Sequence, residues 1–336
     1  MLDQASALRA LMQQREDNDV VEIMDNSNLK DEVKTIVVES ISLEDSIQKT
    51  ETETLLEIDE PLVEAKDVRV VAICSGKGGV GKTNFTVNMA IAEKRAGREV
   101  VIIDIDFGFN NIDVLCGITS QYTLQDVMNG DKTIEEVMIE GPEGIKIIPG
   151  GNDVLSFAHG TKDHQRILKE ELSKLKNIDT ILIDTGAGIS KSLLLYTMFA
   201  QELVVVTTTE PTAFRDAYKF IKLIDHYKIK RNAKIVINRV AVNSDGERTF
   251  KILEALVEQS SLSVKLENLG VIRDDKMVPS SVKAQVPFLL KYPTSQPSRD
   301  IEAIRSKLFM ELDNSKKSRN FSQILNRFVS IYELFS

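Results

Sequence analysis

The chain has 336 residues, of which 42% are hydrophobic, 28% charged and 6% aromatic, with no tryptophan. This length and composition correspond to about two domains, or to one large α/β domain with extensions, and they exclude global disorder. The only two cysteines, Cys74 and Cys116, exclude a disulfide scaffold and a cysteine-rich metal site within one chain.

Charge is distributed unevenly along the chain. The net charge is −9, but residues 1–66 hold 17 acidic and 6 basic residues, whereas the rest holds 34 acidic and 36 basic. The acidity therefore belongs to the first fifth of the chain, and the near-neutral remainder has no clear basic run that would indicate nucleic-acid binding. The sequence shows neither a secretory signal nor eighteen consecutive apolar residues, so we expect a cytoplasmic protein that can still bind a membrane surface.

The first 66 residues divide into a short helix and an acidic segment. Ala5, Leu8, Leu11 and Met12 fall on one face at helical spacing, which predicts a helix within residues 1–14. Residues 15–66 are acidic with scattered apolar pairs, a composition typical of a linker or leader.

Residues 67–312 alternate apolar runs with longer helical stretches, which predicts a doubly wound, mostly parallel sheet flanked by helices. One helix is expected from Asn84 to Arg95, ended by Gly97, and another over 212–231. The expected strands are Val68–Cys74, Val100–Ile105, Ile145–Ile148, Thr180–Ile183, Leu203–Thr207, Ile235–Ile237 and Leu269–Ile272.

The first strand runs into a glycine-rich loop that fits the phosphate-binding pattern G-x-x-x-x-G-K-[ST]. Glycines allow successive backbone N–H groups to surround phosphate oxygens, and the following helix adds the positive end of its dipole. Lys82 would neutralise the β- and γ-phosphates, and Thr83 would offer a hydroxyl to Mg²⁺. The predicted nucleotide site comprises Gly76, Lys77, Gly78, Gly79, Val80, Gly81, Lys82, Thr83 and Asn84.

The additional lysine, Lys77, makes this loop resemble the deviant Walker A motif of the MinD/ParA ATPases. The resemblance implies a P-loop ATPase that uses ATP, ADP and Mg²⁺, and a dimer in which each Lys77 reaches the partner's ATP. It also implies adenine contacts at Asn238 and Arg239. It implies a first switch containing Gly108 and Asn111, and a second one at Gly186.

Three aspartates follow or end buried strands that are predicted to be neighbours. Carboxylates at the carboxyl ends of parallel strands meet where α/β proteins bind ligands. One can hold Mg²⁺ through water while another orients the attacking water. The family resemblance implies that Asp106 takes the water role, and that Asp104 and Asp184 belong to the magnesium shell. Each aspartate alone is also compatible with a helix cap or a strand-end carboxylate.

The N-terminal residues resemble the D-Q-A-x-x-L-R signature of the MinD-like flagellar regulators FlhG, FleN and YlxH. The resemblance implies that this helix stimulates the SRP-type GTPase FlhF. An ordinary amphipathic helix that docks on its own domain is the alternative. The matching residues are Asp3, Gln4, Ala5, Leu8 and Arg9.

Residues 313–336 combine a basic linker with an amphipathic stretch. This stretch resembles the membrane-targeting helix of MinD, and packing on the domain or on a partner protein is the alternative. The apolar face includes Phe321, Ile324, Leu325, Phe328, Tyr332 and Phe335.

Together these features predict an Mg²⁺-dependent ATPase that dimerises with ATP, binds the cytoplasmic membrane, and controls flagellar number or placement at the cell pole. Basal-body or transcription-regulator proteins are further candidate partners, and no specific nucleic acid is expected. A DNA-partitioning ATPase of the ParA kind is the main alternative. An iron–sulfur carrier would need paired cysteines, and an inactive adaptor would not need Lys82, Thr83, Asp106 and Asp184.

Overall fold

The computed structural model describes residues 68–105, 111–151, 162–188 and 191–310. Within these ranges the strands form one sheet in the order β3-β4-β2-β5-β1-β6-β7-β8, in which only the β3–β4 pair is antiparallel. The predicted doubly wound α/β fold is confirmed. The strands are β1 (Arg69–Ser75), β2 (Val100–Ile105), β3 (Ile139–Glu140), β4 (Lys146–Pro149), β5 (Thr180–Ala187), β6 (Glu202–Thr208), β7 (Asn232–Val240) and β8 (Lys265–Arg273).

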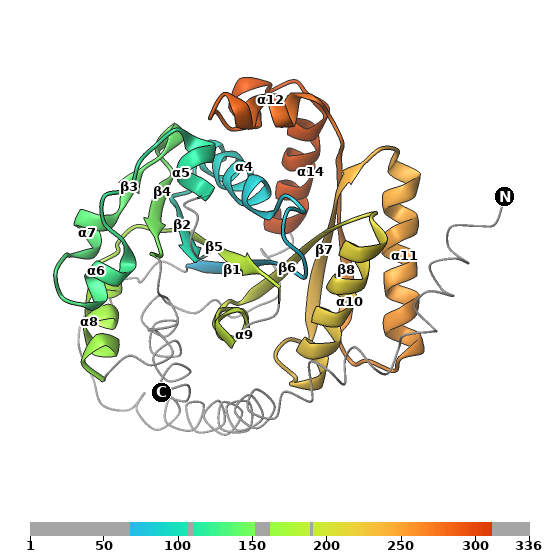
Figure 1. The fold of residues 1–336 in the computed structure, drawn as a ribbon, viewed down its shortest axis with the longest axis horizontal. Helices are drawn as coiled ribbons and strands as arrows, with labels where there is room; N and C mark the ends of the chain where they lie inside the picture. Colours follow the sequence, from blue (N-terminus) through green and yellow to red (C-terminus); the bar gives the residue numbers. More distant parts are fainter. Residues whose placement is uncertain (1–67, 106–110, 152–161, 189–190, 311–336) are drawn as a thin grey trace.

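Helices cover both faces of this sheet, and Figure 1 shows α4 and α14 on one side with α9 on the other. The described helices are α4 (Lys82–Arg95), α5 (Asn111–Cys116), α6 (Leu124–Met128), α7 (Ile134–Val137), the 3₁₀ turn η1 (Pro142–Gly144), α8 (Lys162–Ser173), α9 (Lys191–Phe199), α10 (Pro211–His226), α11 (Asn243–Gln259), α12 (Met277–Lys283), α13 (Phe288–Lys291) and α14 (Gln296–Met310).

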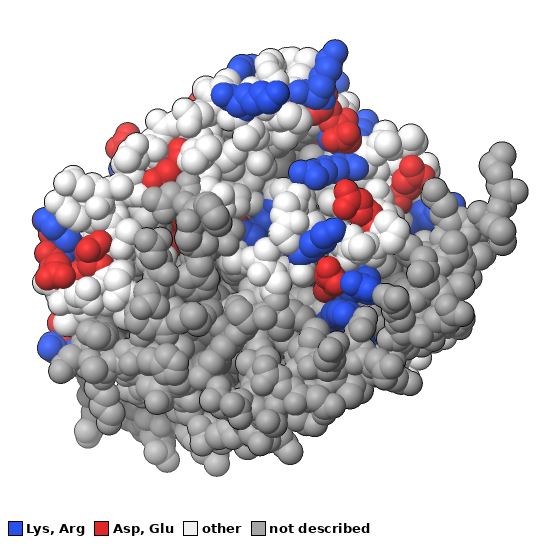
Figure 2. Space-filling view, viewed as in Figure 1, with Lys and Arg blue, Asp and Glu red and all other residues white. Residues whose placement is uncertain are grey.

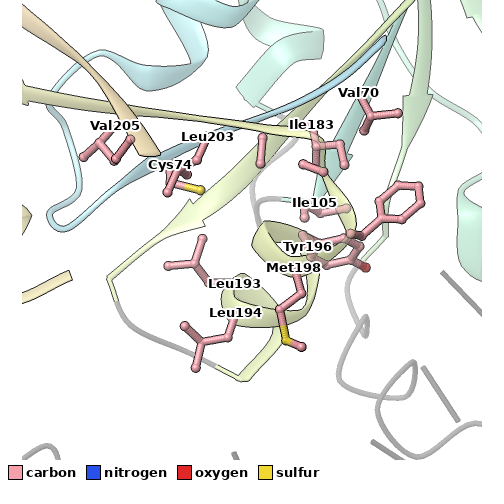
Figure 3. Packing of buried hydrophobic residues seen from close by; sticks show 14 of the residues in the cluster. Val70, Cys74, Ile105, Ile183, Leu193, Leu194, Tyr196, Met198, Leu203 and Val205 are labelled. Carbon is pink, nitrogen blue, oxygen red and sulfur yellow. The ribbon is translucent and has the colours of Figure 1, made fainter. Parts of the chain in front are cut away.

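Each sheet face has its own hydrophobic core, because successive strand residues point to opposite sides. In β1, Val70 and Cys74 belong to the core shared with α8 to α11, whereas Val71 and Ile73 belong to the core shared with α4 and α14. Figure 3 shows the first of these cores, where side chains of α9 lie close to those of β1, β5 and β6. Strands buried on both sides explain the almost continuous Val/Ile/Leu runs of the sequence.

The seven expected strands all form, and the differences lie at the ends of elements. The helix expected over 212–231 ends at His226, because Lys228 adopts a left-handed φ of 51° and Ile229 donates its N–H back to the carbonyl of Ile224. Strand β3 has only two residues, which is too short for a hydrophobic pattern to reveal. Helix α4 begins at Lys82, two residues before the expected start.

The two ends of the described domain lie side by side. The Arg69 guanidinium donates to the carbonyl oxygen of Leu308 at 2.6 Å and stacks over the Phe309 ring, 4.4 Å from its centre. The same guanidinium pairs with Glu202. The segments before residue 68 and after residue 310 therefore attach to the domain at neighbouring points.

Candidate functional site

The loop between β1 and α4 has the backbone conformation of a phosphate cradle. Gly79 and Gly81 have φ angles of +77° and +95°, which side-chain-bearing residues rarely adopt. Gly81 directly precedes α4, so the N–H groups of the first helical turn face the loop. A negatively charged phosphate is favoured at this helix end by those N–H groups and by the helix dipole.

Two neighbouring elements brace this loop. A Cβ at Gly76 would lie only 2.3 Å from the backbone carbonyl of Asp216 in α10, so the loop and α10 touch backbone to backbone. On the other side, Asn238 at the end of β7 donates its Nδ2 proton to the carbonyl oxygen of Val80 at 2.8 Å. The adenine contacts expected of Asn238 and Arg239 stay predictions, and the structure gives Asn238 a bracing contact in addition.

The loop lysine forms a buried ion pair. Lys82 Nζ lies 3.0 Å from Asp184 Oδ1, and the two side chains are 5% and 0% exposed. Thr86, one helical turn after Lys82, donates its hydroxyl proton to the same Oδ1 at 2.9 Å. The other oxygen, Oδ2, is buried and has no hydrogen-bond partner among the described residues.

The carboxylates expected to serve Mg²⁺ are adjacent. Asp104 in β2 stands directly opposite Asp184 in β5 in the parallel register, and it is also buried. Oxygen ligands from carboxylates, hydroxyls and phosphates are those that Mg²⁺ prefers. Asp184 Oδ2 has no hydrogen-bond partner among the described residues, Asp104 lies opposite Asp184 in the sheet, and Thr83 follows Lys82 in α4, so these residues fit an Mg²⁺ ion that bound phosphates help to hold. Within the described residues no three His, Cys, Asp or Glu side chains cluster as a metal site by themselves.

The side chain of Lys77 contacts residues of its own chain. Its Nζ donates to Thr212 Oγ1 at 2.6 Å and lies 3.8 Å from Glu210 Oε2, at the start of α10. These contacts are partly exposed, since the Lys77 and Glu210 side chains are 38% and 62% accessible. The cross-chain role expected of Lys77 therefore requires it to leave Thr212 and Glu210.

Of the remaining expected site residues, two are described by the structure and the others lie outside the described residues. Asn111 begins α5 and Gly186 lies near the end of β5, both next to gaps in the description. Asp106 and Gly108 lie outside the described residues, as do all candidates in the terminal segments. These are Asp3, Gln4, Ala5, Leu8 and Arg9 in the N-terminal helix, and Phe321, Ile324, Leu325, Phe328, Tyr332 and Phe335 near the C-terminus.

Similarity to known proteins identifies the family to which this site belongs. The family described as ParA, "NUBPL iron-transfer P-loop NTPase", matches residues 67–309. The antiactivator FleN of Pseudomonas aeruginosa is 34% identical over 242 residues, which cover 72% of this chain and 86% of FleN. The chain belongs to the MinD/ParA family of P-loop ATPases, in the FleN/YlxH group.

Other MinD/ParA relatives agree with this assignment. The flagellum site-determining protein YlxH of Helicobacter pylori is 30% identical over 249 residues, covering 74% of this chain and 84% of YlxH. The MinC:MinD complex of Aquifex aeolicus matches with a TM-score of 0.61 and 26% identity, over 75% of this chain and 99% of that one. As a MinD/ParA protein, the chain is an ATP hydrolase whose cofactors are ATP, ADP and Mg²⁺.

Two contributors to this MinD/ParA site lie outside the sequence motifs. Thr86 follows Lys82 by four residues, and helical spacing alone places both on one face of α4. The backbone of Asp216 against Gly76 has no signal in the sequence, because it depends on how α10 packs on the loop. Both cysteines are buried, and burial raises the pKa of the Cys74 thiol to about 11 and that of Cys116 to about 12.

The close contact at Gly76 yields a steric prediction. Gly76→Ala should lower the free energy of unfolding by about 1–3 kcal/mol, the usual cost of overpacking, because neither backbone can yield without moving the loop or α10. Gly78→Ala is the matched control, since its Cβ would lie 3.8 Å from the nearest atom, the Ala187 Cβ. Urea unfolding curves compare the two, and equal stability of both variants would contradict the contact.

Proposed function

We propose that this ATPase is an ATP-dependent dimerisation and membrane-association switch that regulates flagellar number or placement. The observation that carries the proposal is the additional loop lysine, Lys77, in a chain whose relatives include the FleN antiactivator and the YlxH flagellum site-determining protein. For the DNA-partitioning alternative, the near-neutral balance of residues 67–336 offers no clear basic run, and on the face in Figure 2 red side chains lie among many of the blue ones.

The chemistry follows from the residues around the loop. Lys82 holds the β- and γ-phosphates, and Thr83, Asp104 and Asp184 provide oxygens to the metal or to its waters. The Mg²⁺ ion, when bound, neutralises charge that develops on the phosphates. Asp106 follows β2 directly and is proposed to orient the attacking water. Hydrolysis would remove the γ-phosphate that the two chains share and so release the dimer.

The terminal segments connect this switch to its surroundings. The helix with Asp3 and Arg9 is proposed to stimulate the GTPase FlhF from the far end of an acidic leader. The C-terminal helix is proposed to enter the lipid boundary at the inner face of the membrane, with two copies in the ATP dimer. The leader's charge of −11 repels anionic lipid, which leaves the C-terminal helix as the membrane contact.

The proposed site of action is the cell pole, reached from the cytoplasm. Basal-body or transcription-regulator proteins are proposed as further partners of the ATP dimer. Within the described residues, no helix is both long and apolar enough to cross a bilayer.

Lys77→Ala should still bind ATP but should lose ATP-driven dimerisation, because the cross-chain cation is gone. Thr212→Val is the matched control, since it removes the hydrogen bond from Lys77 to Thr212 and keeps the lysine and its ion pair with Glu210. Light scattering with and without Mg²⁺-ATP measures the mass of each variant. A wild-type chain that stays monomeric with ATP, or a Lys77→Ala chain that dimerises normally, contradicts the proposal.

Deleting residues 1–14 should abolish stimulation of FlhF GTPase activity and leave ATP binding intact, since the predicted nucleotide site begins only at Gly76. Deleting residues 15–28 removes the same number of residues from the leader, keeps the helix, and should retain stimulation. Phosphate release by FlhF is the measurement. Equal stimulation by the two deletion variants would assign the activity elsewhere.

Phe328→Glu should reduce ATP-dependent sedimentation with anionic phosphatidylglycerol vesicles severalfold, because it places a charge on the apolar face of the helix. Ser330→Glu adds the same charge to the polar face and should change sedimentation far less. If both variants sediment like the wild type, the C-terminal helix does not bind lipid.

A further inference from the structure

The two oxygens of the buried Asp184 carboxylate differ in the hydrogen bonds that they accept. Oδ1 accepts from Lys82 Nζ at 3.0 Å and from Thr86 Oγ1 at 2.9 Å. Oδ2 is equally buried and has no hydrogen-bond partner among the described residues. Both donors that the described residues provide therefore bind one oxygen, and the other oxygen is open to a further partner.

Bound ATP would offer Lys82 a second anionic partner. The β- and γ-phosphates carry more negative charge than a single carboxylate, and the P-loop lysine is their counter-charge. If its ammonium moves to the phosphates, Asp184 loses its ionic partner, although its side chain is 0% exposed in this structure. An ionised carboxylate in such a place needs other hydrogen bonds and a nearby cation.

Thr86 can supply the hydrogen bond that remains. Its side chain is fully buried on α4, and its hydroxyl lies 3.1 Å from the carbonyl oxygen of Lys82 as well as 2.9 Å from Asp184 Oδ1. A hydroxyl has one proton to donate, and a charged acceptor binds it more strongly than a neutral carbonyl. The donation to Asp184 is therefore favoured, and it does not depend on where Lys82 points.

We propose that Thr86 is a positioning residue for the metal: it holds Asp184 by Oδ1, so that Oδ2 serves the Mg²⁺ shell when Lys82 moves to the phosphates. Its role is distinct from that of Thr83, whose hydroxyl is proposed to bind the metal itself. Mg²⁺ demands near-ideal octahedral geometry, so it is sensitive to the orientation of the carboxylates around its waters. The proposal rests on the assignment of Asp184 to the magnesium shell.

The test compares Thr86→Val, which keeps the shape and loses the hydroxyl, with Thr86→Ser, which keeps the hydroxyl. Titration calorimetry gives the affinity for a non-hydrolysable ATP analogue in EDTA and at a series of Mg²⁺ concentrations. Thr86→Val should need ~10-fold more Mg²⁺ for half-maximal tightening, the usual size of a second-layer effect on metal affinity. Its affinity in EDTA should stay within about twofold of the wild type, as expected of a residue that does not touch the nucleotide. Thr86→Ser should restore the Mg²⁺ dependence.

An unchanged Mg²⁺ requirement in Thr86→Val, or an equal loss of affinity with and without Mg²⁺, would overturn the role of Thr86. If Thr86→Val does not fold, as judged by its thermal unfolding curve, Thr86→Ala is measured in its place against the same two criteria. The wild-type protein distinguishes the role of Thr86 from the magnesium site on which it rests. If ATP binding by the wild type did not respond to Mg²⁺, the magnesium site itself would be contradicted.

Discussion

The ion pair between Lys82 and Asp184 is the interaction on which the rest of the site depends. It joins the first turn of α4 to β5, between β1 and β2, with both side chains almost fully buried. Charges removed from water are costly unless they are paired, so the pair constrains the phosphate loop and the carboxylate edge of the sheet together. A ligand that carries several negative charges can exchange places with Asp184 as the partner of Lys82. The site is therefore held together by the same contact that ATP must rearrange.

Much of this arrangement is predictable from the sequence. The apolar runs gave all seven longer strands, since a strand buried on both faces needs apolar residues at nearly every position. The loop motif predicts the position of Lys82. The carboxyl ends of parallel strands meet at one edge of the sheet, so the sequence also predicts that Asp104 and Asp184 lie close together. The position of Thr86 beside Lys82 is predictable too, because residues four apart lie on one face of a helix.

Other features depend on tertiary contacts that no local pattern encodes. Asn238 lies 158 positions from Val80, and only the order β1-β6-β7 brings its amide to the loop. The backbone contact between Gly76 and Asp216 depends on the docking of α10, and the placement of Lys77 on Thr212 does too. The early end of α10 is set by a left-handed turn at Lys228, a residue without glycine's preference for it.

The two ends of the described domain lie side by side, which bears on the layout of the proposed switch. The family match ends at residue 309, and Arg69 contacts Leu308 and Phe309, so the leader and the C-terminal segment attach at neighbouring points of the domain. A domain that approaches a membrane through its C-terminal segment would bring the point where the leader joins the domain to the same place. The acidic residues of the leader would repel anionic lipid, which agrees with the proposal that the N-terminal helix acts on a protein partner.

The most direct measurement is a crystal structure of the chain with Mg²⁺ and a non-hydrolysable ATP analogue. We expect Lys82 Nζ at the β- and γ-phosphates, with the Thr86 hydroxyl still within hydrogen-bond distance of Asp184 and the metal shell on the side of Oδ2. A structure in which Lys82 stays on Asp184 while the phosphates are held without it would contradict the exchange. So would a structure in which Thr86 has turned away from Asp184 and bonds only the Lys82 carbonyl.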